Sequence, residues 1–86
     1  MITYQQENLT KHDVTVEEAD EAISNSLVAV ELPLSARLNN RIMFVGFTME
    51  GRLLEVGVEY LTDEHEHVFH AMDATKEYRK LFAKSI

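Results

Sequence analysis

The chain holds four histidines, and the first of them follows a lysine, a pairing that could serve acid–base chemistry on a phosphate. Histidine titrates closest to neutral pH, so His12 could act as a general acid or base while Lys11 contacts a phosphate group. A helix that ends here would carry the same pair, because cations interact favourably with the C-terminal end of a helix dipole. Residue types alone favour this second, structural interpretation.

Two glutamates and a histidine could meet on one face of a predicted sheet. Glu55 and Glu59 are four residues apart, roughly 13 Å at strand rise, which is too far for a pair of glycosidase carboxylates. His70 or His67, from the next strand, could fall between them as a general base held by a carboxylate. Simple solvation of both glutamates is the favoured alternative.

His65 and His67 are two residues apart in a predicted strand and therefore share a face, with His70 on the other face. Imidazoles at this spacing reach one zinc ion if a third ligand converges on it. A polar edge strand that resists pairing with other chains explains the same pattern. We favour the edge strand and expect neither a metal nor another cofactor.

Arginines at two places could bind phosphate oxygens through paired N–H groups. Arg52 follows the glycine of a predicted hairpin, and Arg79 lies one turn into the last predicted helix. Each could instead form a surface ion pair with Glu50, Glu77 or Asp73, which would contribute less than about 1 kcal/mol.

The elements that must position these residues follow from local patterns. A short helix is predicted over residues 4–11. Thr15 and Glu18 form a capping box, which opens a second helix that ends near Asn25. Asp73 or Thr75 can cap a last helix, whose apolar stripe includes Tyr78 and Phe82.

Strands are predicted between the second and the last helix, over residues 27–32, 41–47, 53–61 and 65–72, with a loop over 33–40. Gly51 can adopt a positive φ in the hairpin between the second and third strands. The sequence therefore predicts an α+β fold: a small antiparallel sheet of three to four strands, with two N-terminal helices and one C-terminal helix.

Composition sets the class of protein. Eighty-six residues make a single domain spanning 1–86, without cysteine and with a net charge of −7. That charge disfavours general binding to nucleic acids. The absence of cysteine and of a membrane span or signal segment suits a cytoplasmic protein. The strand over 41–47 is apolar on both faces, so we expect a homodimer or a partner to cover one of them.

Three segments together resemble the BrnT-like family of small bacterial toxins. The family patterns are N-x-x-K/R-H-G-V, G-R-T-x-x-G-R-L-L and S/T-A-R-x-x-T-x-x-E-R. The matching segments begin at Asn8, Gly46 and His70, in the same order as in the family, and the resemblance runs from about Asn8 to Phe82.

The resemblance implies a RelE-like fold and a metal-independent ribonuclease toxin, the toxin component of a type II toxin–antitoxin system, held inactive by a small antitoxin protein. Carried over by position, it implies catalytic roles for His12, Arg52 and Arg79, with His70 as an additional candidate. It also implies that Lys11 and Thr75 bind the RNA substrate.

Four of the departures of this chain from the family pattern bear on the chemistry. Phe47 and Met72 stand where the family has arginine, Tyr78 replaces a glutamate, and His70 replaces a small hydroxyl residue. Two cations that would stabilise a phosphate transition state are thereby lost. A non-catalytic interaction module of the same fold, acting as a homo-oligomer or with a small partner protein, is therefore the alternative.

Overall fold

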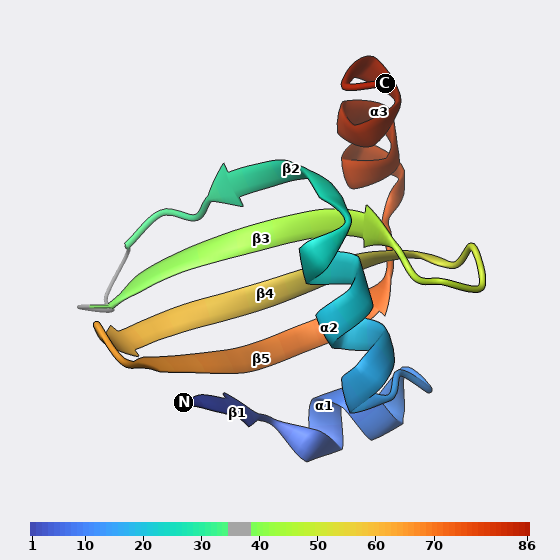
Figure 1. Cartoon of the computed structure of the whole chain (residues 1–86). Helices are drawn as coiled ribbons and strands as arrows, with labels where there is room; N and C mark the ends of the chain where they lie inside the picture. Colours follow the sequence, from blue (N-terminus) through green and yellow to red (C-terminus); the bar gives the residue numbers. More distant parts are fainter. Residues whose placement is uncertain (35–38) are drawn as a thin grey trace.

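The structure is a computed structural model that describes residues 1–34 and 39–86 (Figure 1). The chain begins with a short strand and two helices, continues through four strands and closes with a helix. In order these are β1 (Ile2–Tyr4), α1 (Gln6–Lys11), α2 (Val16–Ser24), β2 (Ser26–Glu31), β3 (Asn40–Phe47), β4 (Leu53–Thr62), β5 (His65–Asp73) and α3 (Lys76–Lys84).

The strands form one five-stranded sheet in the order β1-β5-β4-β3-β2. Neighbours are antiparallel except β1, which pairs parallel with β5 through Ile2, Thr3 and Tyr4. The expectation of an antiparallel, RelE-like sheet of three to four strands is therefore wrong. A three-residue strand is too short to give a readable alternation, and its pairing with β5 is set by contacts more than sixty residues away in the chain.

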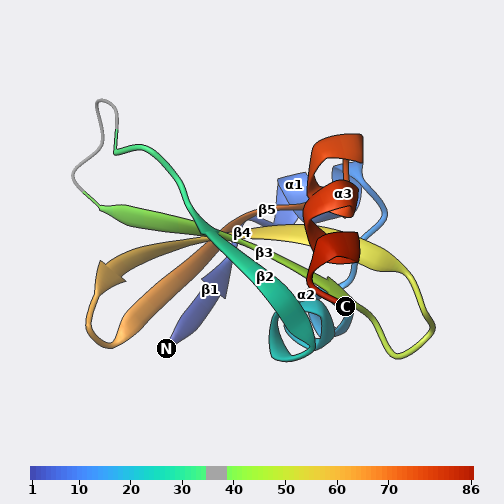
Figure 2. The same cartoon turned by 90° about the horizontal axis from the view of Figure 1, so that it is seen from above.

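Helices cover both faces of the twisted sheet at one end. Helix α2 packs on one face and α3 lies on the opposite side (Figure 2), while Leu9 of α1 joins the core under α2. The larger core, under α1 and α2, is built around Leu9, Ala19, Leu54, Val56 and Val68. None of the helices in the described ranges is long and apolar enough to cross a membrane.

The face of β3 away from α2 is also covered within the chain. Met43 is 7% exposed and Val45 is fully buried, and Val45 belongs to a second core with Phe82 of α3. The chain itself therefore covers part of this face, and a homodimer or partner at this strand stays a prediction. Helix α3 supplies this cover through Phe82, and Val28 of the neighbouring strand β2 extends the same core.

Several local expectations are confirmed. Thr15 accepts from the Glu18 amide at 3.1 Å while the Glu18 carboxylate accepts from the Thr15 amide at 2.9 Å, and α2 ends at Ser24 with Asn25 as its C-cap. Gly51 has φ 87° in the hairpin. Thr75 precedes α3 but its side chain makes no capping bond. The predicted loop over 33–40 falls partly outside the described residues.

A β-bulge in β5 decides which way His70 points. Gly57 pairs with His70 but Val58 pairs with Val68, so Phe69 is an extra residue on β5. The Asn8 side chain of α1 donates to the Phe69 carbonyl at 2.6 Å and so holds the bulge. His70 consequently shares a face with His67, and the prediction that they lie on opposite faces is wrong.

Candidate functional site

Five of the six residues proposed from sequence gather where β4 begins, β5 ends and α3 starts. The His12 and His70 rings lie 6.3 Å apart between centroids. Arg52 and Thr75 are tied to the same place by hydrogen bonds, and the charge of Arg79 acts on Asp73 there. Lys11 is exposed on α1, and no hydrogen bond within the described ranges joins it to the others. We call this group the His70 cluster.

Glu55 is the buried centre of the cluster. Its side chain shares a face of the sheet with His70 and is only 4% exposed. Oε2 lies 2.9 Å from His70 Nε2, and Oε1 accepts from the Thr75 amide at 2.7 Å. A buried carboxylate is costly unless its oxygens are paired, and here both are. Glu55 therefore fixes the ring of His70 and the start of α3.

This geometry orients the two ring nitrogens of His70 differently. Because Nε2 faces Glu55, the tautomer with Nε2–H donates to the carboxylate and leaves the Nδ1 lone pair open to accept a proton. The carboxylate would then stabilise the imidazolium, as in other carboxylate–histidine pairs. Sequence reasoning raised this pairing but left Glu55 out of the site, since alternation alone could not place the bulge.

Arg52 is fully engaged by the protein. Its Nε donates to Asp73 Oδ1 at 2.7 Å, and its terminal nitrogens donate to the Asp13 carbonyl at 2.6 Å and the His12 carbonyl at 2.9 Å. The hydrogen bond that Arg52 donates to Asp73 is the main reason that the pKa of Arg52 is raised. Arg52 thus positions the α1–α2 turn, where Asp13 has φ 55°, against β4 and β5. It is a positioning residue for His12 rather than an open phosphate ligand.

Arg79 is the more accessible cation of the cluster. Its Nε donates to the Ala74 carbonyl at 2.8 Å, which anchors the base of the guanidinium. Its charge helps to lower the pKa of Asp73, after the larger effect of the Arg52 hydrogen bond. Within the described ranges, its terminal nitrogens make no hydrogen bond to the protein, so they can meet a phosphate.

The two remaining histidines form a separate arrangement at the β1 edge. Thr3 Oγ1 lies 2.9 Å from His65 Nε2 and 2.7 Å from His67 Nδ1, so one hydroxyl bridges both rings. The part of the chain that the structure describes contains no group of three or more metal-ligating side chains. The histidine pair instead joins β1 to β5.

A further cation occupies the same sheet face beyond His70. The Arg41 guanidinium stacks 3.9 Å from the Phe69 ring centroid and its Nη2 lies 3.2 Å from Glu59. Asn39 also donates to Glu59, at 3.1 Å. Arg41 and Glu59 are cross-strand partners in the β3–β4 register. The predicted strands could have suggested this pair, but sequence reasoning did not include it.

Comparison with known proteins gives no assignment: no model of a protein family and no curated protein sequence matches the chain.

Proposed function

We propose that this protein is a divergent BrnT-like toxin of a type II toxin–antitoxin system, acting in the cytoplasm as a metal-independent ribonuclease. One observation carries the proposal: two histidines face each other across 6.3 Å, and a buried carboxylate holds one of them. Such a pair can take a proton from a ribose hydroxyl and give one to the leaving oxygen of the phosphodiester.

The reaction is a transfer within the RNA backbone. His70 Nδ1 accepts the proton of the ribose 2′-hydroxyl as that oxygen bonds to phosphorus. The bond from phosphorus to the 5′-oxygen breaks, and protonated His12 donates a proton to the leaving oxygen. The products are a 2′,3′-cyclic phosphate and a 5′-hydroxyl. Arg79 stabilises the charge that develops on the phosphate oxygens, and Lys11 contacts the backbone further out.

Catalysis of this kind should be weak here. Phe47 packs edge-on against Phe82 with ring centroids 5.1 Å apart, and Met72 is the cross-strand partner of Glu55. Neither position supplies the positive charge that the family pattern has there. The net charge of −7 further slows the approach of RNA.

The test is cleavage of a labelled RNA oligonucleotide by purified protein. We expect cleavage in the presence of EDTA, a cyclic phosphate product, and no cleavage when the 2′-hydroxyls are replaced by hydrogen. His12→Ala and His70→Asn should each lower the rate by about 100-fold or more, the usual contribution of a general acid or base. Arg79→Ala should also lower it, and Glu55→Gln should shift the pH profile.

His65→Ala is the matched control, because it removes a histidine that lies outside the His70 cluster. Cleavage that is equal in wild type, His12→Ala and Arg79→Ala would contradict the site assignment and indicate a contaminating nuclease. Wild-type protein that neither cleaves RNA nor slows growth on expression would contradict the ribonuclease itself.

The alternative function is a non-catalytic interaction module, and exposed apolar side chains favour it. Phe47 is 42% exposed, Leu81 is 40% and Ile86 is 85%. Expression with and without the neighbouring gene separates the two functions. A module should leave growth unchanged in both cases yet co-purify with the neighbour's product. A toxin should slow growth only when expressed alone.

A cognate antitoxin should be basic where it meets α2. This helix carries Glu17, Glu18, Asp20 and Glu21 and no base. Complementary charge raises association rates, so we expect slower association as salt shortens the Debye length from about 10 to about 3 Å. An on-rate that is independent of salt would contradict this charge-matched partner.

A further inference from the structure

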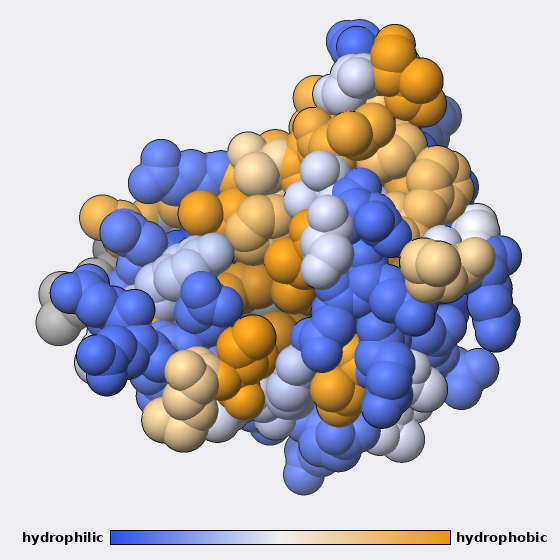
Figure 3. All heavy atoms as spheres, in the orientation of Figure 1, coloured by the Kyte–Doolittle hydropathy of each residue, from blue (hydrophilic) through white to orange (hydrophobic). Residues whose placement is uncertain are grey.

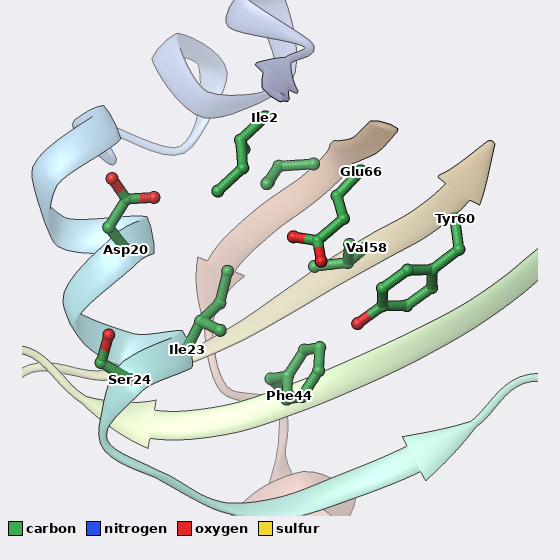
Figure 4. Close-up of a pocket in the computed structure, with 9 residues that line it drawn as sticks. Ile2, Asp20, Ile23, Ser24, Phe44, Val58, Tyr60 and Glu66 are labelled. Atoms are coloured by element: carbon green, nitrogen blue, oxygen red, sulfur yellow. The ribbon is translucent and has the colours of Figure 1, made fainter. Parts of the chain in front are cut away.

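A cavity lies on the face of the sheet opposite the His70 cluster, beside α2 (Figure 4). Its volume is about 290 Å³. The apolar walls come from α2, β3, β4 and β5: Ile23, Phe44, Val58 and Val68. Apolar side chains also show at the surface next to α2 (Figure 3). The cavity therefore offers an apolar surface that is separate from the proposed catalytic residues.

The polar groups of the cavity are acidic. Asp20 and Glu66 line it from opposite sides, and the aromatic Tyr60 closes a third side. Among the described residues that line the cavity there is no lysine, arginine or histidine. A ligand that balances this charge must be a cation.

The acidic side is already ordered without a ligand. The Tyr4 hydroxyl donates to Asp20 Oδ1 at 2.6 Å, which holds the carboxylate in place and leaves Oδ2 available. Burial raises the pKa of Tyr60, and the nearby charge of Glu66 raises it further, so the phenol stays neutral beside the carboxylate. Prepositioned groups reduce the entropy that a ligand must lose on binding.

The volume of the cavity limits how large the bound cation can be. At about 30 Å³ for each water in the liquid, the cavity has room for roughly ten atoms heavier than hydrogen. The aliphatic side chains and the Phe44 and Tyr60 rings suit a hydrocarbon chain, and an ammonium can also interact with an aromatic face. A nucleotide is excluded by its negative charge as well as by its size.

We propose that this cavity binds a small free aliphatic amine, with one ammonium at Glu66 and its hydrocarbon chain against Ile23, Phe44 and Val58. In a diamine or polyamine, a second ammonium lies at Asp20. The site does not depend on the ribonuclease proposal, because it shares no residue with the His70 cluster. Through this cavity beside α2, the protein could bind a diamine or polyamine.

Binding can be followed by methyl NMR of the whole protein, with hexylamine and spermidine as probes. We expect shifts at the methyl groups of Ile23, Val58 and Val68. Hexanol, which lacks the charge, should bind to the wild type at least about fivefold more weakly than hexylamine does. Hexylamine should bind to Glu66→Gln at least about fivefold more weakly than to the wild type, a loss of about 1 kcal/mol of binding free energy. Glu50→Gln is the matched control, since it removes the same charge from the exposed hairpin.

Three outcomes would overturn the proposal. Equal losses of hexylamine affinity in Glu66→Gln and Glu50→Gln would mean that the amine is attracted by the net negative charge of the protein and not by this cavity. Equal affinities for hexanol and hexylamine would mean that the carboxylates do not recognise the cation. The third probe is a lysine whose α-amino and carboxyl groups are both blocked as amides. If it binds as tightly as hexylamine, the cavity binds a lysine side chain of a partner protein and not a free amine.

Discussion

Individual side chains at the His70 cluster are fixed by charge rather than by packing. Arg52 links Asp73 to the carbonyls of His12 and Asp13, and Glu55 links His70 to the Thr75 amide. Arg52 and Glu55 therefore join the α1–α2 turn, β4, β5 and the start of α3. Because the partners of Arg52 come from β5 and from the α1–α2 turn, its loss should loosen His12 without removing any proposed catalytic group.

Asp73 makes the strength of this link depend on pH. The Arg52 hydrogen bond lowers the pKa of Asp73, with smaller effects from the charges of Arg79 and His12. A carboxyl group whose pKa is lower in the folded state stabilises the fold above its unfolded pKa, and this contribution disappears as pH falls through the folded pKa. The contribution of Asp73 should therefore be complete at neutral pH and lost below about pH 4.

The measurement is urea denaturation of wild type and Asp73→Asn at pH 7 and near pH 3. We expect the variant to be less stable at pH 7 and the difference between the two proteins to shrink at low pH. Asp63→Asn, in the exposed β4–β5 turn, is the control and should change stability little at either pH. A difference that stays constant with pH would show that the carboxylate charge is not involved.

At the scale of elements, the N-cap residue Thr15 sets where α2 begins. Thr15 satisfies a free amide at the first turn of the helix. Thr15→Ala should lower the free energy of unfolding by about 0.5–2 kcal/mol and leave the fold unchanged. Chemical denaturation measures this, with Thr10→Ala on α1 as the control. An unchanged midpoint would mean that the cap does not contribute to stability.

Strand β1 is held to α2 by one hydrogen bond whose proton is lost at high pH. Burial, followed by the hydrogen bond to Asp20 and the charge of Asp20, raises the pKa of Tyr4 from 10.0 to about 12. A group with a raised pKa stabilises the fold below its unfolded pKa, and that contribution is lost as pH rises through the folded pKa. The stabilisation by Tyr4 should therefore disappear between about pH 10 and 12.

Tyr4→Phe isolates this effect. We expect the variant to lose less stability than wild type between pH 9 and pH 12, as measured by denaturant unfolding at each pH. Burial also raises the pKa of Tyr78, so Tyr78→Phe should remove only the share of the alkaline loss that Tyr78 causes and keep the share that Tyr4 causes. If wild type and Tyr4→Phe lose stability in parallel, Tyr4 does not link β1 and α2 in this way.

At the scale of the whole molecule, apolar side chains remain outside on or beside α3. They are Phe47, which packs on Phe82, together with Leu81 and Ile86. Contacts between identical surfaces are the commonest route to a dimer. We expect a dimer by light scattering at tens of micromolar, and a monomer for Leu81→Lys. Lys80→Ala is the control. A monomeric wild type would contradict self-association.

The sequence by itself determined the features that neighbouring residues set. The Thr15–Glu18 capping box, the end of α2 near Asn25 and the positive φ of Gly51 depend on a few consecutive residues. The four strands from β2 to β5 were predicted to within two residues at each end, because their runs of apolar residues are long.

Only the tertiary structure decided how the chemistry is arranged. Pairing of β1 with β5, the bulge at Phe69 and the engagement of Arg52 all join residues far apart in the chain. The bulge matters most, because one extra residue moves every following side chain to the other face of a strand. His70 contacts Glu55 for that reason, and the alternation of polar and apolar residues along β5 does not predict the bulge.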